Sequence, residues 1–526
     1  METEDKNVQP DEHSVAQPES VSAETEVSAS GEAVAPKYKG FFGKLDKFFG
    51  ISKAKSSFRA EIIGGLVTFM AMVYILPVNA GMLGSLDGVG FGAIYIATAL
   101  SAVVGTMLMA LLARLPMAQA SGMGLNAFMV YTICFGFGLS YANALLLVLI
   151  DGVVFILLTV TGLRKMLFNA IPKVVRIAIP AGIGLFIAFI GMQNVKLVVA
   201  DGATLVKLAT FNFLGDATYG GVMPLIVTVL GIIAVAVMSK KGIKGAMLWA
   251  ILGGTALYWI FMGIGYGYGD AACIKVINDF SFSNPIDAFK AWGTESIGQV
   301  FAKGFDFSDY IAAHGGANLA LVIITSSLAF CMVDMFDTMG TLYGACARGN
   351  MLEKDGSIPN MNKAMLCDAV ATTTGAICGT STVTTFVESS AGIGAGARTG
   401  FASIITSACF LLAMFLTPIA EMIPSAATSI ALIYVGVLMM NCVREIEWTD
   451  ASEAVPAFLT IAMMPLTYNI SYGIAFGIIS WLLIKCFVML CSIRNKEALL
   501  AEKKEPINPV TVVIAVLFLL MFFLTH

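Results

Sequence analysis

Long apolar runs separated by short polar loops fill most of the chain from residue 61 onward. A helix of about 20 apolar residues spans the hydrocarbon core of a membrane. The pattern predicts an all-α polytopic membrane protein with fourteen spans. Their predicted bounds are 61–83, 91–113, 117–136, 143–163, 174–194, 221–238, 246–266, 317–343, 364–380, 382–397, 400–420, 425–442, 453–469 and 471–491. A fifteenth run, 509–525, has a length of 17 residues, which is marginal for a crossing, and we expect a packed or interfacial helix there.

Basic residues test this count independently, because short cytoplasmic loops carry an excess of Lys and Arg. They follow the even-numbered spans, for example Arg114 after the second, Lys240 and Lys241 after the sixth, and Arg444 after the twelfth. The loops after odd-numbered spans are poor in bases, apart from the long interval that follows the seventh span. We therefore expect both ends of the fourteen-span body to be cytoplasmic.

The spans fall into two groups of seven, separated by the interval 267–316. An odd number of spans per unit puts the two halves in opposite orientations, as in transporters built from inverted repeats. Segments 180–195 and 428–443, the fifth spans of the two halves, both contain a glycine and end in an Asn and a Val. The sequence therefore predicts two inverted seven-span repeats.

The third span of each half differs from an ordinary apolar helix. Segments 116–130 and 380–396 begin with residues of poor helix propensity, mainly Ser, Thr, Gly and Gln. Asn126 in the first, and Ser389 and Ser390 in the second, are good N-cap residues for the helix-compatible run that follows. Each span is therefore predicted to be short and broken, with an extended stretch before a half-helix, which is the best sequence indication of a transporter's substrate site.

A simpler interpretation treats the glycines of these segments as close helix packing, which accounts for Gly392 and Gly396. It leaves Glu388 unexplained, because an acidic residue inside a membrane costs at least about 2.5–3.5 kcal/mol on insertion scales. The predicted spans hold five such acids: Asp151, Asp334, Asp337, Asp368 and Glu388.

These carboxylates differ in their expected roles. Asp334 and Asp337 are three residues apart and share a polar helix face with Thr338 and Thr341. We expect Asp334 and Glu388 to contact a ligand, with Asp337 as a neighbour that sets the charge of Asp334. The sequence does not distinguish a proton-coupling role from a structural role for Asp368. Asp151 lies near no other signal and is expected to brace neighbouring helices.

Composition narrows the class of protein further. Hydrophobic residues make up 58% of the chain and charged residues 13%, and the mean hydropathy is +0.84, which excludes an ordinary soluble protein. Residues 1–36 hold nine acids and one base, a net charge of −8. Because the whole chain carries −4, the remainder carries +4, and the balance gives no reason to expect a nucleic-acid partner. The tail 1–36 is predicted to be disordered and cytoplasmic.

Cysteine and histidine give no sign of a metal site or an enzyme. The ten cysteines form no CxxC pair, and the three histidines lie outside the predicted spans. We expect no cofactor and no metal, and we do not expect an enzyme.

Five blocks of the chain occur in a characteristic order. They are EIIGGLVTFMAMVYILPVNAGML (61–83), ASGMGLNAF (120–128), MVDMFDTMGTLYG (332–344), VESSAGIGAGARTG (387–400) and PLTYNISYGIAFGII (465–479). Together they resemble the AzgA-like guanine/hypoxanthine/adenine permeases of the nucleobase-ascorbate transporter superfamily. The similarity runs from about residue 40 to the C-terminus, and the ordered set of blocks is specific although each block is short.

The resemblance implies a core domain that moves against a gate domain, usually within a homodimer and by an elevator-like motion. The corresponding division of this chain is the tail 1–36, core 37–163, gate 164–266, an extracellular connection 267–316, core 317–420, gate 421–491 and a C-terminal segment 492–526.

The resemblance also implies a purine site. It is built from Asp334, Glu388 and the region of Asn126, with Asp337 as the next carboxylate of the motif and Gly124 in the interruption. Ser389 and Ser390 lie at the start of the second half-helix. An ionised carboxylate accepts N–H bonds from a purine edge, and a protonated one donates to it.

The expected function is uptake of hypoxanthine or guanine, with adenine as a further candidate, by proton symport across the plasma (inner) membrane. We expect the proton gradient to drive this uptake and membrane lipid to surround the protein. The alternative is a transporter of anions or other small solutes with the same fold.

Overall fold

The computed structural model describes residues 40–163, 170–215, 217–280, 284–353, 357–492 and 507–524. The predicted disordered tail, 1–36, lies outside the described residues. The first half begins with α1 and continues through a series of helices that one short strand interrupts. These elements are α1 Gly40–Phe49, α2 Phe58–Met72, α3 Ile75–Leu83, α4 Phe91–Leu108, η1 Met109–Ala113, β1 Gln119–Ser121, α5 Met123–Ala127, η2 Phe128–Gly136 and α6 Tyr141–Thr161.

The chain then forms a hairpin, three long helices and a row of short helices. The elements are α8 Lys173–Asn194, β2 Val198–Asp201, β3 Leu205–Leu208, α9 Tyr219–Lys240 and α10 Ala246–Gly267, followed by α11 Ala271–Asp279, α12 Pro285–Ala291, η3 Trp292–Ser296, α13 Gln299–Ala302 and α14 Ser308–His314. The row from α11 to α14 occupies the predicted connection 267–316.

The second half of the chain is again a series of helices that one short strand interrupts. Its elements are α15 Gly316–Arg348, α16 Met361–Cys378, β4 Val383–Thr385, α17 Ser389–Gly394, α18 Gly400–Ala413, η4 Met414–Leu416, α19 Thr417–Glu421, α20 Ser425–Met439, η5 Met440–Glu445, α21 Ala451–Thr467, α22 Ile470–Ser492 and α24 Pro509–Leu524. The α24 helix packs against α22 and α15, within the run predicted as a packed or interfacial helix.

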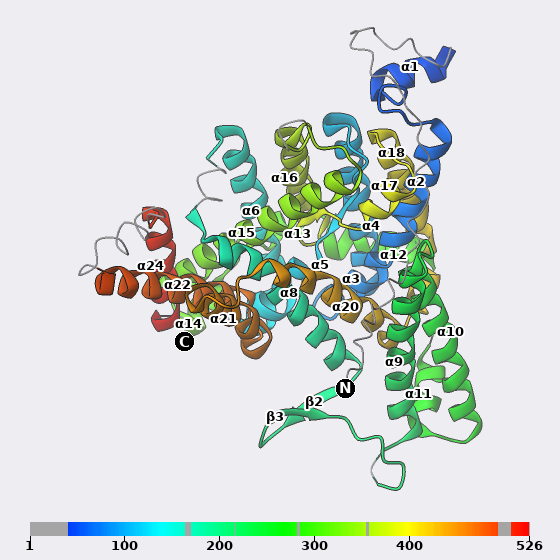
Figure 1. Ribbon diagram of the computed structural model, residues 1–526. Helices are drawn as coiled ribbons and strands as arrows, with labels where there is room; N and C mark the ends of the chain where they lie inside the picture. Colours follow the sequence, from blue (N-terminus) through cyan, green and yellow to red (C-terminus); the bar gives the residue numbers. More distant parts are fainter. Residues whose placement is uncertain are drawn as a thin grey trace, which may run out of the picture.

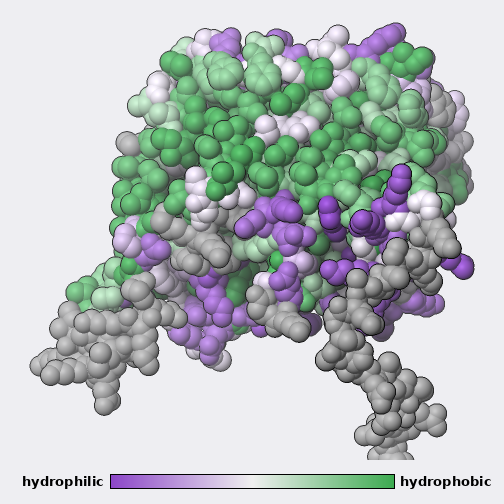
Figure 2. All heavy atoms as spheres, turned by 90° about the horizontal axis from the view of Figure 1, so that it is seen from above, coloured by the Kyte–Doolittle hydropathy of each residue, from purple (hydrophilic) through white to green (hydrophobic). Residues whose placement is uncertain are grey.

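Among the described residues, ten helices are long and apolar enough to cross a membrane. They include most of the predicted spans, and Figure 2 shows a face of the molecule that is largely covered by hydrophobic residues. Three further apolar helices are shorter: Met123–Gly136, Ala451–Thr467 and Pro509–Phe523. The chain is a multi-pass membrane protein in which about ten helices have the length of a full crossing.

Two short two-stranded sheets accompany the helices of this mostly helical chain. One sheet joins the extended stretches predicted in the two interrupted spans, and the other is a hairpin that the sequence did not predict. Strands β2 and β3 form an antiparallel hairpin that projects from the helices (Figure 1), with Val198 opposite Leu208. The tight turn begins at Asp201, whose side chain accepts hydrogen bonds from the backbone N–H groups of Ala203 and Thr204. These bonds and a salt bridge to Lys207 lower the pKa of Asp201 to about 2.

Helices of the two halves pack on each other in two sets. In one set, α2, α4 and α6 pack against α16, α17 and α18. In the other, α8, α9 and α10 pack against α20, and α8 also packs against α21. Figure 1 shows α9 and α10 beside each other on one side of the molecule, away from α16 and α6.

The contact between α2 and α17 requires glycine. A Cβ added at Gly392 would overlap the Thr68 hydroxyl and the Gly64 carbonyl, and one added at Gly64 would lie 2.5 Å from the Cβ of Ala397. The backbones therefore touch, and the packing role that the sequence suggested for Gly392 has a physical basis.

We expect Gly392→Val to destabilise the protein by about 1–3 kcal/mol, because overpacking at a backbone contact forces the helices apart. The measurement is the unfolding temperature of the detergent-purified protein. Gly394→Val is the matched control in the same helix, since a Cβ there meets no atom within 4 Å. Equal unfolding temperatures for the two variants would contradict this explanation of the contact.

Candidate functional site

The two interrupted segments pair with each other. Strands β1 and β4 are antiparallel, with Gln119 opposite Thr385 and Ser121 opposite Val383. The pairing continues past the strands, where the N–H of Gly122 donates to the Thr382 carbonyl at 2.9 Å and the N–H of Phe386 donates to Ala118 at 3.0 Å. Non-helical backbone at membrane depth must find its partners within the protein, and here each segment supplies them to the other.

Asp368 of α16 is the most completely hydrogen-bonded carboxylate beside this pair of strands. Its Oδ1 accepts from the amide of Gln119 at 2.9 Å and from the hydroxyl of Thr385 at 3.2 Å, and its Oδ2 accepts from Thr338 at 2.7 Å. Asp368 has no exposed surface. One carboxylate therefore joins β1, β4, α15 and α16.

Asp334 and Asp337 of α15 lie in different surroundings. Asp334 is fully buried, with the Thr372 hydroxyl 3.4 Å from its Oδ2 and no partner for its Oδ1 among the described residues. Asp337 is partly exposed and accepts from the Thr384 hydroxyl at 3.4 Å. It also interacts electrostatically with Glu388. In this conformation Asp337, rather than Asp334, is the α15 carboxylate beside Glu388.

Glu388 immediately precedes α17 and is held by a tyrosine from the other half of the chain. The Tyr74 hydroxyl donates to Oε1 of Glu388 at 2.6 Å, and Tyr74 is buried at the start of α3. Next to Glu388, the hydroxyl oxygen of Ser389 accepts from the N–H of Ala118 at 3.0 Å. Ser390 is partly exposed, and its N–H donates to the Val387 carbonyl at 2.9 Å.

The expected helix caps were wrong in detail. The α5 helix begins at Met123 with Gly122 as its N-cap residue, so Asn126 lies inside the helix. The side chain of Asn126 instead accepts from the Ser121 hydroxyl at 2.7 Å. In the second segment, α17 begins at Ser389 and no side chain caps it. No side chain therefore caps either half-helix in the way that the sequence suggested.

Gly124 lies where the first interruption meets α8. A Cβ added there would overlap Cγ2 of Ile183, and α5 packs against α8. The absence of a side chain lets a segment of the first helix set approach a helix of the second set closely. This contact links the predicted site to the helices expected to form the gate.

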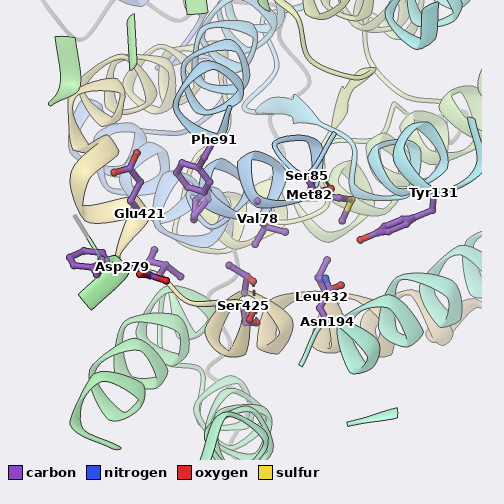
Figure 3. A pocket seen from close by; sticks show the side chains of 15 residues that line it. Val78, Met82, Ser85, Phe91, Tyr131, Asn194, Asp279, Glu421, Ser425 and Leu432 are labelled. Carbon is purple, nitrogen blue, oxygen red and sulfur yellow. Dashed lines mark hydrogen bonds between the residues drawn. The ribbon is translucent and has the colours of Figure 1, made fainter. Parts of the chain in front are cut away.

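A cavity of about 680 Å³ lies between α3 and α20, and Figure 3 shows its lining. Val78 and Met82 of α3 face Ser425 and Leu432 of α20 across it. Polar groups at its ends include Asn194, which is hydrogen-bonded to Tyr131. None of the predicted site residues lines this cavity, although its wall on α3 starts three residues after Tyr74.

Within the described part of the chain, no group of three or more His, Cys, Asp or Glu side chains is placed to hold a metal ion. The carboxylates around β1 and β4 are instead bound by amide and hydroxyl donors.

Comparison with known proteins assigns the chain to a family. The family model described as "Permease family" matches residues 59–476. This chain belongs to the permease family. The guanine/hypoxanthine permease PbuO of Bacillus subtilis strain 168 is 37% identical over 90% of this chain and 100% of its own length. The adenine permease AdeP of Escherichia coli K12 is 32% identical over 91% of this chain and 96% of its own length. The resemblance drawn from the sequence blocks is confirmed.

Solved structures support the fold of this permease. The transmembrane domain of a cyanobacterium bicarbonate transporter, BicA, superposes with a TM-score of 0.55 at 14% identity, covering 79% of this chain and 97% of that domain. Murine Slc26a9, an anion transporter in the inward-facing state, gives 0.53 at 11% identity, covering 88% of this chain and 74% of that one. Identities this low establish the likeness of fold alone.

Several residues of the candidate site were not found by sequence reasoning. Gln119 was part of the polar segment that the sequence singled out, but its bond to Asp368 depends on a residue 249 positions away. Tyr74 is one aromatic residue in an apolar span and carries no local signal. Asn79 bridges Thr98 and Thr380 with its amide nitrogen, at 2.7 and 2.9 Å.

We expect Gln119→Leu to lower the stability of the permease by about 1–3 kcal/mol, because Asp368 loses the donor of Gln119 and stays buried. The measurement is the unfolding temperature in detergent. Gln299→Leu is the control, since the amide of Gln299 donates to the Thr294 carbonyl in a solvent-exposed hydrogen bond and not to a buried carboxylate. An unchanged unfolding temperature for Gln119→Leu would show that Asp368 does not depend on this bond.

Proposed function

We propose that this permease is a secondary active transporter that imports purine nucleobases by proton symport. The observation that carries the proposal is the collection of buried and partly buried carboxylates around two paired, interrupted segments, in a chain whose full-length relatives are named nucleobase permeases. Hypoxanthine and guanine are the proposed substrates, with adenine as a further candidate. The proposed role is transport and not enzymatic chemistry.

The chemistry of the site suits a planar base with N–H donors beside acceptors on its edge. An ionised Glu388 can accept N–H bonds, and a protonated carboxyl of Asp334 or Asp337 can donate to a ring nitrogen or carbonyl oxygen. We propose that Glu388 and Asp334 hold opposite edges of the base, with Asp337 beside them and Asp368 positioning the strands. Asn126, Gly124, Ser389 and Ser390 belong to the two segments that frame the base.

The bond from Tyr74 gives Glu388 a fixed position before substrate arrives. Its 2.6 Å length is typical of a hydroxyl donating to a carboxylate. A carboxylate that accepts one bond from the protein keeps lone pairs for further donors. Glu388 is therefore both oriented and able to accept from a purine.

The proposed mechanism moves one helix set against the other. The set containing α2, α4, α6 and α16–α18 would be the core, and α8–α10 with α20–α21 would belong to the gate. The full proposal is fourteen spans in two inverted repeats, cytoplasmic ends, a homodimer in the plasma membrane and elevator-like alternating access. The likeness of fold to the solved neighbours and the packing of α5 on α8 through Gly124 support only the division into two helix sets that contact each other.

An anion transporter is the second candidate, because the structural neighbours include a bicarbonate transporter and an anion transporter. Fold does not fix substrate, and function is decided by the site. Several carboxylates around an anion would repel it unless they were protonated. The acids around β1 and β4 therefore favour a base with N–H donors over an anion.

Uptake of labelled hypoxanthine into cells that lack their own purine permeases tests the function. We expect accumulation, competition by unlabelled guanine, and loss of accumulation with an uncoupler because the proton gradient supplies the energy. Uracil and bicarbonate serve as competitors of other classes. Uptake of labelled bicarbonate without any uptake of hypoxanthine would favour the anion transporter.

We expect Glu388→Gln and Asp334→Asn to abolish hypoxanthine binding, because each removes a carboxylate that pairs with an edge of the base. Binding of labelled hypoxanthine to purified protein measures the effect. Asp287→Asn is the control, since that carboxylate lies in α12 with its side chain 64% exposed and is bound to Lys290. Unchanged uptake kinetics in both site variants would rule out this assignment.

A further inference from the structure

Asp151 is a buried acid that the proposed purine site does not use. It lies in α6, has no exposed surface, and neither of its carboxyl oxygens has a hydrogen-bond partner among the described residues. The sequence alone suggested a brace between helices. A carboxylate that braces helices accepts hydrogen bonds from them, and no described residue donates a hydrogen bond to Asp151.

The neighbours of Asp151 are also acidic. The α6 helix packs against α15 and α16, and Asp334 and Asp368 from these helices interact electrostatically with Asp151. Cys331 of α15 is a further titratable neighbour. No basic side chain among the described residues interacts with Asp151.

The other elements packed against α6, which are α13 and η2, add no charged neighbour of Asp151 among the described residues. The α13 helix carries no titratable residue. In η2, Tyr131 is hydrogen-bonded to Asn194, and Cys134 interacts with Tyr141. The charge of Asp151 is therefore set by burial and by the two other carboxyl groups.

Hydrogen bonding ranks the three acids. Asp368 accepts from three donors, Asp334 has one hydroxyl at 3.4 Å, and Asp151 has none. An ionised carboxylate only accepts hydrogen bonds, and neighbouring buried carboxylates cannot all carry charge. Asp368 is the one best able to stay ionised. Because no described donor stabilises its charge, Asp151 is the acid of the three that most favours the protonated form.

We propose that Asp151 is a proton-binding residue of the transport cycle, separate from the groups that contact the purine. This inference rests on the proposed proton symport and names a residue that carries the coupling proton. A proton enters from the water on one side of the membrane, binds the Asp151 carboxylate, and returns to the water on the other side. No bond of the purine is made or broken.

The electrostatic contact with Asp334 provides the coupling to substrate. Charge on Asp151 disfavours charge on Asp334, and the reverse also holds. Because linkage is reciprocal, a purine that binds better to one charge state of Asp334 changes the affinity of Asp151 for a proton. Coupling therefore requires no contact between Asp151 and the base.

The decisive variant is Asp151→Asn in proteoliposomes, because Asn has nearly the size of a protonated Asp and cannot titrate. Two quantities are measured with hypoxanthine as the probe: exchange of labelled base across the membrane, and proton influx driven by the base, recorded with a trapped pH dye. We expect exchange to persist, while proton influx and accumulation driven by a pH gradient are lost. Thr159→Val is the matched control, since Thr159 lies in the same helix and its buried hydroxyl has no partner among the described residues.

Each other outcome overturns a stated part of the proposal. Undiminished proton influx in Asp151→Asn removes Asp151 from coupling, and so does a variant that no longer folds, because a neutral side chain of the same size should be tolerated where a protonated acid is. Wild-type protein that exchanges hypoxanthine without proton influx contradicts proton symport. Wild-type protein that exchanges no hypoxanthine contradicts the proposed function itself.

Discussion

The pairing of β1 with β4 is the interaction on which the rest of the structure depends. Two segments that leave the helical conformation expose backbone N–H and C=O groups, and each such group left without a partner in an apolar surrounding costs several kcal/mol. The two strands satisfy one another from Gln119 to Ser121 and from Val383 to Thr385, and the flanking bonds of Gly122 and Phe386 extend the pairing.

This backbone pairing determines which side chains lie beside the buried acids. The strands bring Gln119 and Thr385 to Asp368, and Thr384 to Asp337. The turn after β4 then places Glu388 next to Tyr74. Acidic residues that would each be costly in a membrane thus gather where the interrupted backbone already requires a polar, protein-enclosed interior.

Much of the architecture could be predicted because it has local causes. Apolar runs predicted the long helices, and the poor helix formers around Gln119 and Thr384 predicted both interruptions. The hairpin of β2 and β3 was missed, although its apolar residues flank Asp201 and Gly202, a recognised turn pair. The partners of the acids could not be predicted, since the bonds from Gln119 to Asp368 and from Tyr74 to Glu388 join residues 249 and 314 positions apart. The acidic neighbours of Asp151 could not be predicted either, because Asp334 and Asp368 lie on two later helices.

The long separation of β1 and β4 has a consequence for how the protein is made. Synthesis proceeds from the N-terminus, so β1 is complete well before the ribosome reaches β4. Gln119 of β1 and Thr385 of β4 are 266 residues apart in the sequence. Until then, the first half of the chain has a strand without its partner. Contacts this distant in sequence form late in folding. The insertion machinery or water must therefore supply hydrogen-bond partners for the Gln119–Ser121 backbone during biogenesis. The first seven predicted spans alone do not provide the strand that pairs with it.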